Sequence, residues 1–375
     1  MNTARTRLHI GISGSYGGMN IGDEAILQGI LTQLRASMAA DVTVFSMNPA
    51  DTLARHNVER AVNARTMTRR EAASEVERLD LFVLGGGGIL YDGEAGHYLR
   101  EVVIAGELNV PVIVYAISAG PLAGPRSRQV VREALNASAS TIITVRDRLG
   151  YRLLEDVGVT RDIHLTADPA FLIEPEPAVD ALATEGVHLD RRLVGFSVRE
   201  PGPAAPDIDP EEYYALLANS ADFIVGRYDA DVVFVPMEKT DIQHSHRVVA
   251  YMQHAEHAEI LRRRYSPSQM LYLMGLFDFV VGMRLHFLIF AAHHGTPFIA
   301  LPYASKVVGL LEDLDLETPP LGSFGIGDLI ARIDHAWDTR DDIRAQILRR
   351  LPVLKTRARQ TNELLMGLVE STLIA

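Results

Sequence analysis

Residues 277–306 read FDFVVGMRLHFLIFAAHHGTPFIALPYASK, and the chain is organised around this stretch. A short apolar run is followed at once by Arg284, Leu285 and His286, and then by an apolar helical segment that ends near Gly295. The pattern predicts a strand, a turn and a helix. In an open α/β sheet this order places the arginine and the histidine at the carboxyl end of a strand, where ligands bind beside helix amides that favour anions. We therefore expect an anionic ligand.

The Arg-Leu-His triplet also has a purely structural interpretation. An arginine at a strand end often only pairs with a neighbouring carboxylate, and a histidine that opens a helix is often an ordinary surface residue. A second apolar strand, PFIALP, follows directly, and its loop PYASK brings Ser305 and Lys306 to the same sheet edge. Cationic and proton-carrying side chains then converge on one crevice, which favours a binding site.

Composition narrows the class of protein. A chain of 375 residues, 47% of them hydrophobic, can fill the cores of two α/β domains. With 36 Lys and Arg against 48 Asp and Glu, the net charge is -12, which argues against a nucleic-acid partner. The absence of cysteine excludes disulfides and thiol catalysis, and the histidines between residues 244 and 257 lack the spacing of a zinc helix. We expect no metal and no cofactor.

The first half alternates apolar strands with helical segments, which predicts right-handed βαβ crossovers and a parallel sheet. LHIGIS leads into the glycine-containing loop GSYGGMNIGDEAIL, and LFVL leads into GGGGILYDG. The first loop is neither a P-loop nor a clean G-x-G-x-x-G fingerprint, and its acidic residues also suit a helix N-terminus without any ligand. The candidate ligand-binding or catalytic residues at these strand ends are Gly14, Asn20, Asp23, Gly87, Gly88, Asp92 and Ser118.

A proline-rich acidic segment at residues 174–177 is the candidate linker, because the strand-and-helix pattern starts again beyond it with LVGFSVRE, which ends in Arg199 and Glu200. We predict an α/β protein with Rossmann-like parallel-sheet domains at residues 1–178 and 179–350, with strand ends facing a cleft. Residues 351–375 are predicted to form a helix that packs back on the first domain. The loop PGPAAPDIDP, residues 201–210, is either a lid or a solvated connection.

Several motifs together resemble the polysaccharide pyruvyl transferase family across nearly the whole chain. They are GSYGGMNIGDEAIL, LGGGGILYD, AISAGP, VRD with ADPAF, GFSVR, and GMRLHFLIFAAHHGTPFIALPYASK. Each motif is weak by itself, whereas their order and spacing are specific. The resemblance implies two facing domains of the GT-B kind and transfer of pyruvate from phosphoenolpyruvate onto two hydroxyls of a sugar as a ketal. It also associates Arg284, Leu285 and His286 with phosphoenolpyruvate, and Arg199 as the arginine that faces them.

Ketal formation requires an acid, a base and a clamp for anions. Arginine suits the clamp through two-point contacts, and histidine suits the acid because both of its protonation states are accessible near neutral pH. We therefore expect Arg284, Arg199 and Lys306 to hold the anionic groups and His286 to be the acid. Asp92 or Asp23 is the expected base and sugar contact. Ser305 and the glycines, asparagine and serine named above are expected to line the substrate site.

Two other functions are compatible with this sequence. The same two-domain fold serves glycosyltransferases that use nucleotide sugars, and a non-catalytic anion- or sugar-binding protein could retain the same cleft. The first residues lack the apolar core of a signal peptide, so we expect a cytoplasmic protein. The basic residues between Arg349 and Arg359 are compatible with peripheral contact at the inner face of a membrane, where a lipid-linked acceptor would lie.

Overall fold

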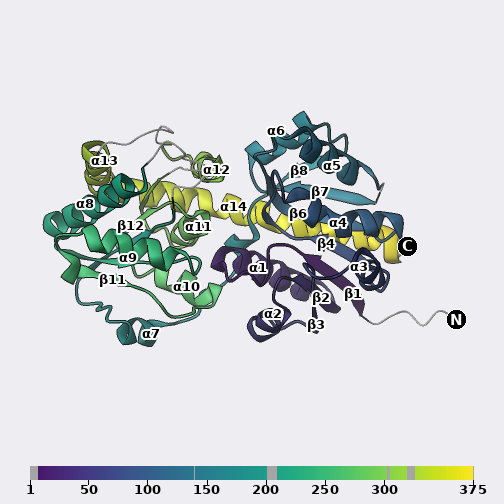
Figure 1. The fold of residues 1–375 in the computed structure, drawn as a ribbon, viewed down its shortest axis with the longest axis horizontal. Helices are drawn as coiled ribbons and strands as arrows, with labels where there is room; N and C mark the ends of the chain where they lie inside the picture. Colours follow the sequence, from purple (N-terminus) through teal and green to yellow (C-terminus); the bar gives the residue numbers. More distant parts are fainter. Residues whose placement is uncertain (1–6, 139, 201–208, 302–304, 319–325, 375) are drawn as a thin grey trace. The chain divides into compact units, whose positions relative to one another are not determined.

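The computed structural model describes residues 7–138, 140–200, 209–301, 305–318 and 326–374. Two compact units divide the chain: unit 1 comprises residues 1–173 and 353–375, and unit 2 comprises residues 174–352. Each unit contains a parallel sheet with helices, so the predicted α/β class with two parallel-sheet domains is confirmed (Figure 1). The linker predicted at residues 174–177 begins where unit 2 begins.

Unit 1 alternates strands and helices along residues 8–172. Its strands are β1 (Leu8–Ser13), β2 (Ala40–Ser46), β3 (Arg60–Asn63), β4 (Leu81–Leu84), β5 (Gly87–Leu90), β6 (Val112–Ala119), β7 (Thr141–Val145) and β8 (Ile163–Leu165). Its helices are α1 (Ile21–Ser37), α2 (Pro49–Arg55), α3 (Arg69–Val76), α4 (Ala95–Glu107), α5 (Pro125–Asn136), α6 (Arg148–Val157) and the 3-10 turn η1 (Pro169–Leu172). The strand order is β3-β2-β1-β4-β6-β7-β8, and β5 pairs with β6.

The sheet of unit 1 is buried on both faces, as its nearly continuous apolar strands require. Leu81 and Val83 of β4 belong to one core cluster, together with α1 and the end of the last helix. Phe82 and Leu84 belong to the opposite cluster, together with α3, α4, α5 and α6. Because successive side chains of a strand point to opposite faces, this division places helices on both sides of the sheet.

The last helix, α14 (Arg340–Val369), carries the chain from unit 2 back into unit 1 and is followed by a π-helical turn, Glu370–Ile374. Pro352 lies inside the helix, at the boundary between the units. Leu365, Leu368 and Val369 are buried in the core of unit 1. Arg357 Nη2 donates a hydrogen bond to the Thr166 carbonyl at 2.5 Å. The apolar side of this helix therefore packs on the sheet of unit 1.

Unit 2 is built on a smaller sheet. Its strands are β9 (Arg192–Ser197), β10 (Ala230–Phe234), β11 (Ala258–Ile260), β12 (Phe279–Gly282) and β13 (Phe298–Ala300), in the order β11-β10-β9-β12-β13. Its helices are α7 (Val179–Thr184), α8 (Pro210–Tyr228), α9 (Asp241–Tyr251), α10 (Pro267–Met274), α11 (Leu285–His294), α12 (Ser305–Leu314) and α13 (Ile326–Asp338), with a 3-10 turn, η3, at Ala255–His257. The predicted strand, turn and helix around the Arg-Leu-His triplet are thus β12, a short turn and α11.

None of the described helices combines the length and the apolar character needed to cross a bilayer. Residues 302–304 of the PYASK loop lie outside the described residues, as do residues 201–208 of the proline-rich loop. The lid interpretation of that loop therefore stays a prediction.

Gly29 marks a close approach inside unit 1. A Cβ atom on this residue of α1 would lie 2.3 Å from the Pro169 carbonyl oxygen of η1, which is backbone and cannot rotate away. We expect Gly29→Ala to lower the free energy of unfolding by about 1–3 kcal/mol, the usual cost of overpacking. Gly367→Ala is the matched control, since nothing lies within 4 Å of its Cβ position in α14. That change should instead stabilise the helix by about 0.5–1 kcal/mol, and calorimetric unfolding of both variants tests the pair.

Candidate active site

The sheet register of unit 2 brings the predicted substrate-binding segments together. In the pairing of β9 with β12, Ser197 lies opposite Gly282, so Arg199 and Arg284 both follow the same point of adjacent strands. Leu301 donates its amide to the Gly282 carbonyl at 2.8 Å, which keeps the chain after β13 beside the same edge. The carboxyl ends of parallel strands thus gather these residues, as expected for a ligand site in an open α/β sheet.

Arg284 is held by two carboxylates that follow β10. Its Nε lies 3.1 Å from Asp241 Oδ2 and its Nη2 lies 2.5 Å from Asp241 Oδ1, which is a two-point contact. Nη2 also donates to Glu238. Burial works against the charge of Arg284, but these carboxylates outweigh burial and raise the pKa of its guanidinium. The arginine therefore has the carboxylate-pairing role that its position at a strand end allowed.

Asp241 is fully buried and organises the turn that carries it. Its Oδ2 accepts the amides of Met237 at 3.0 Å and Glu238 at 3.2 Å, just before α9 begins. Burial raises the pKa of this carboxyl, and the charge of Arg284 opposes that effect. Because a buried carboxylate needs a partner, Asp241 and Arg284 depend on each other.

Arg199 is the half-buried cation next to this ion pair. Its backbone amide lies 3.4 Å from Met283 Sδ, which also accepts the Tyr213 hydroxyl at 2.6 Å. Its Nε is buried and has no hydrogen-bond partner among the described residues, and the same holds for the nearby Ser197 Oγ. Burial lowers the pKa of Arg199, and the neighbouring charge of Arg284 lowers it further. A bound anion would supply the hydrogen-bond acceptor that Arg199 Nε lacks among the described residues.

His286 is the second residue of α11, and Arg284 occupies the N-cap position of this helix without a side-chain capping hydrogen bond. The side chain of His286 is half-buried and its Nε2 atom is buried. Leu285 is only 7% exposed and belongs to the buried apolar residues, so it packs rather than reaching a ligand. Ser305 and Lys306 open α12, but the Ser305 side chain lies outside the described residues.

Two histidines of the 244–257 group have structural partners. His244 Nδ1 lies 2.6 Å from the Tyr214 hydroxyl, and His257 Nδ1 lies 2.9 Å from Asp231 Oδ1. In the part of the chain that the structure describes, no three His, Cys, Asp or Glu side chains converge as metal ligands would.

The predicted residues of unit 1 also gather at one sheet edge. Gly87 and Gly88 pair with Ile117 and Ser118, because the last glycines of the GGGG segment form β5 beside β6. A Cβ on Gly87 would lie 3.6 Å from Asp23 Oδ1, so Asp23 faces this strand. Asn20 caps α1 by accepting the Gly22 amide at 2.9 Å. The sequence did not predict β5 as a strand.

Gly14 and Asp92 have clear structural tasks. A Cβ on Gly14 would lie 2.6 Å from the Tyr16 ring, so the glycine makes room for that buried side chain. Asp92 accepts the amides of Ala123 at 2.8 Å and Gly124 at 3.1 Å. The Ala123 amide and the Ser127 hydroxyl lower the pKa of Asp92. A carboxylate whose charged form is stabilised in this way organises a loop better than it accepts a proton.

Sequence reasoning assigned no role to a buried polar group at the same edge of unit 1. Arg146 Nη1 lies 2.5 Å from Asp168 Oδ2, and both side chains are nearly inaccessible to solvent. Arg146 Nε has no hydrogen-bond partner among the described residues, and Nη2 is the nearest atom, at 3.9 Å, to a Cβ on Gly88. Tyr16 is fully buried nearby, and burial followed by the charges of Asp23, Glu24 and Asp168 raises its pKa. Arg146 belongs to the VRD motif and Asp168 to the ADPAF motif. The sequence motifs therefore included both residues but did not show that they pair with each other.

The fold and these two sheet edges define an α/β protein of the GT-B type with polar and cationic residues at the strand ends. The chain belongs to the polysaccharide pyruvyl transferase family, whose sequence model matches residues 20–305. It is similar to the amylovoran biosynthesis protein AmsJ of Erwinia amylovora, with 21% identity over 296 residues that cover 75% of this chain and 71% of that protein.

Two solved structures show the same fold at low identity. Anabaena Alr3699/HepE in complex with UDP and glucose superposes with a TM-score of 0.66 and 12% identity, covering 97% of this chain and 100% of that one. A UDP-N-acetylglucosamine 2-epimerase homologue from Listeria monocytogenes gives a TM-score of 0.64 and 12% identity, covering 97% and 96%. At this identity the likeness extends to the fold alone.

Proposed function

We propose that this protein transfers pyruvate from phosphoenolpyruvate to two hydroxyls of a sugar in a cell-envelope polysaccharide or glycolipid precursor, releasing phosphate and forming a ketal. Family membership supports action on a polysaccharide. The observation that carries the donor assignment is Arg199, a half-buried cation whose Nε lacks a hydrogen-bond partner among the described residues. A ligand with a carboxylate and a phosphate supplies the acceptor oxygens that this guanidinium needs.

The proposed reaction follows from the bonds that must change. His286 donates a proton to the methylene carbon of phosphoenolpyruvate, and the neighbouring carbon becomes an oxocarbenium centre. A sugar hydroxyl attacks that carbon and loses its proton to a base. The bond from carbon to the phosphate oxygen then breaks, phosphate leaves with the electron pair, and a second hydroxyl closes the ketal with loss of its own proton. No metal or redox cofactor takes part in this proposal.

The roles of the other residues follow from their contacts. Arg284 is committed to Asp241, so Arg199, with Lys306, is the proposed primary anion contact, and Arg284 adds a positive charge close to Arg199. Asp23 is the proposed base and sugar contact, because Asp92 is held by backbone amides that lower its pKa. Gly87, Gly88 and Ser118 share one sheet edge with Asp23 and provide a close approach for the sugar.

A second candidate is transfer of a sugar from a nucleotide sugar, because a solved structure of this fold was obtained with UDP and glucose. Thermal shift separates the candidates: phosphoenolpyruvate should raise the Tm under the first proposal and a nucleotide sugar under the second. Stabilisation by either ligand without phosphate release or glycosyl transfer to any sugar tested would instead indicate a non-catalytic binding protein.

Arg199→Gln tests the donor assignment. Glutamine keeps hydrogen-bonding capacity but removes the charge, so we expect phosphoenolpyruvate affinity to fall by about 1.5–3 kcal/mol, the range for a hydrogen bond to a charged group. Isothermal calorimetry measures the change. Arg262→Gln is the matched control, because this exposed arginine of unit 2 makes no side-chain ion pair among the described residues. Equal affinities of the Arg199 variant and the unmodified protein would remove Arg199 from the donor site.

A further inference from the structure

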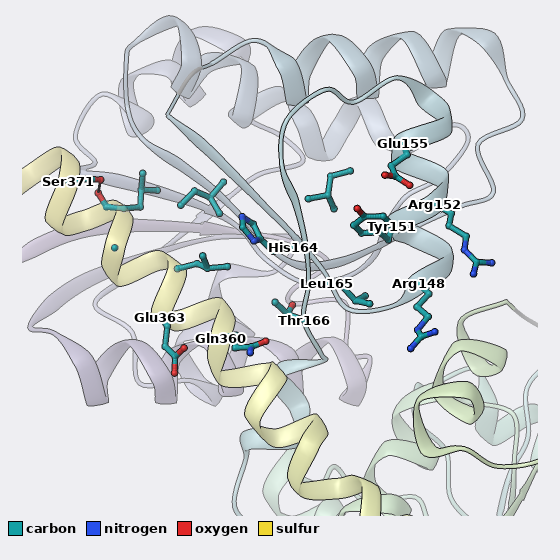
Figure 2. Close-up of a pocket in the computed structure, with 15 residues that line it drawn as sticks. Arg148, Tyr151, Arg152, Glu155, His164, Leu165, Thr166, Gln360, Glu363 and Ser371 are labelled. Carbon is teal, nitrogen blue, oxygen red and sulfur yellow. Dashed lines mark hydrogen bonds between the residues drawn. The ribbon is translucent and has the colours of Figure 1, made fainter.

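Unit 1 contains a pocket of about 1110 Å³ that none of the proposed catalytic residues lines. It runs along β8, the edge strand of the sheet, between α6 and the end of α14. Figure 2 shows α14 (yellow) on one side with Gln360 and Glu363, His164 between the helices, and Arg148 and Arg152 projecting from α6 on the other side. All lining residues belong to unit 1.

The pocket is lined with apolar side chains that the fold leaves partly uncovered. Half-buried apolar residues come from three elements, namely Ile142 of β7, Ile163 and Leu165 of β8, and Leu364 of α14. The half-buried ring of Tyr151 on α6 adds to them. Water in contact with this surface is unfavourable, so a hydrocarbon ligand would gain free energy by covering it.

Two cations stand at the end of the pocket next to the carboxyl end of β7. Arg148 and Arg152 are one helical turn apart on α6, are both exposed, and make no ion pair among the described residues. The carboxylates that line the pocket are Glu155 and Glu363, and Glu155 hydrogen-bonds the Tyr151 hydroxyl. In a chain with a net charge of -12, two exposed arginines that make no ion pair among the described residues, beside an apolar surface, favour a ligand that is anionic at one end and apolar along its length.

We propose that this pocket binds the hydrocarbon chain and phosphate of a lipid-linked sugar acceptor, with the phosphate on Arg148 and Arg152 and the chain along β8. The proposal rests on the proposed function and specifies its acceptor class. The carboxyl end of β7 lies at the same sheet edge as Ser118, because Ile117 pairs with Val145. A lipid phosphate there would leave the attached sugar near the edge that carries Asp23, Gly87 and Gly88.

Calorimetry with farnesyl phosphate, below its aggregation concentration, tests binding to the full chain. We expect the double substitution Arg148→Ala/Arg152→Ala to weaken binding by about 10- to 100-fold, because two charge-assisted contacts are lost. Leu364→Gln should weaken it by about 10-fold through the apolar lining. The controls are Arg126→Ala, an exposed arginine of α5 without an ion pair among the described residues, and Leu53→Gln, whose leucine is 47% exposed on α2. Both controls should bind normally.

The probes also separate the parts of the proposal. Farnesol that binds as tightly as farnesyl phosphate would overturn the role of the arginines, and inorganic phosphate that competes at similar concentration would overturn the role of the apolar lining. Unchanged binding by both the arginine and Leu364 variants would place the lipid elsewhere. Sedimentation that shows a dimer weakened by the same substitutions would assign the pocket to a second copy of the chain and overturn the lipid proposal.

Transfer assays distinguish failure of this inference from failure of the proposed function. With a water-soluble sugar acceptor, Arg148→Ala/Arg152→Ala should release phosphate from phosphoenolpyruvate at the unmodified rate. With a prenyl-phosphate-linked sugar at low concentration, kcat/KM should fall about 10-fold or more. Equal losses of activity with both acceptors would contradict lipid recognition. If the unmodified protein transferred pyruvate to neither acceptor, the proposed pyruvyl transfer would be wrong, and the calorimetric experiment with farnesyl phosphate would still decide whether the pocket binds a lipid phosphate.

Discussion

Replacing Arg284 by glutamine should lower the free energy of unfolding of unit 2 by about 3–5 kcal/mol, because the change leaves Asp241 as a buried carboxylate without its charge partner. Asp241 is fully buried, and Arg284 meets it through two hydrogen bonds of 3.1 and 2.5 Å. The chain has one tryptophan, and Trp337 lies in the core of unit 2. Its fluorescence during urea unfolding therefore reports on the unit that contains the ion pair.

A double-mutant cycle separates this effect from loss of packing. Asp241→Asn in the Arg284→Gln background removes the stranded charge, so the double variant should be more stable than Arg284→Gln alone. Arg262→Gln, the exposed control, should change stability by no more than about 0.5 kcal/mol. Two results would contradict a stabilising role of the ion pair at this sheet edge. One is a change within that same range for Arg284→Gln, and the other is a further loss of unfolding free energy of similar size when Asp241→Asn is added.

The surroundings of Arg284 show which features of the structure could be predicted from the sequence and which could not. The strand, turn and helix of residues 277–295 were correctly predicted, because an apolar run, a polar turn and an apolar helical segment follow each other without ambiguity. In unit 2, Ser266 and Gln269 form a capping box at the start of α10, which hydrogen bonds between near neighbours in the sequence determine. Features that depend only on neighbouring residues could therefore be predicted from the sequence.

The partner of Arg284 could not be predicted from the sequence in this way. Asp241 lies 43 residues before it, after β10, and β9 separates β10 from β12 in the sheet. The sequence predicts the strands but not their order, so the carboxylates after β10 could not be assigned to the arginine after β12. The same reasoning applies to Arg146 and Asp168 in unit 1. Long-range polar contacts need the sheet topology.

The glycine segment of unit 1 shows a second limit. Four successive glycines suggested a loop near a ligand, whereas Gly87–Leu90 forms β5 and pairs with β6. Asp92, which follows this strand, is recruited by amides at residues 123 and 124, about thirty positions away in the chain. In the sequence, a carboxylate that follows a run of glycines, such as Asp92, resembles a catalytic base. Only its hydrogen bonds in the structure show that it organises a loop.

His286→Gln should leave most phosphoenolpyruvate binding intact and lower turnover by about 10²–10⁴-fold, the range for a lost general acid. Glutamine has similar length and can still donate a hydrogen bond, but it cannot transfer a proton. The helix amides at the start of α11 and Arg199 remain in place, so the anion should still bind. Calorimetry with phosphoenolpyruvate measures binding, and phosphate release in the presence of an acceptor measures turnover.

The two variants of the donor site should differ in kind, and this difference is the sharpest test of the assigned roles. Arg199→Gln should mainly raise the dissociation constant, whereas His286→Gln should mainly lower kcat. His246→Gln is the control, because this exposed histidine of α9 makes no side-chain hydrogen bond or ion pair with the described residues, so the change should alter neither quantity. Near-normal turnover in His286→Gln would transfer the acid role to another group, and a loss of binding equal to the loss of turnover would make His286 a substrate contact instead of the proton donor.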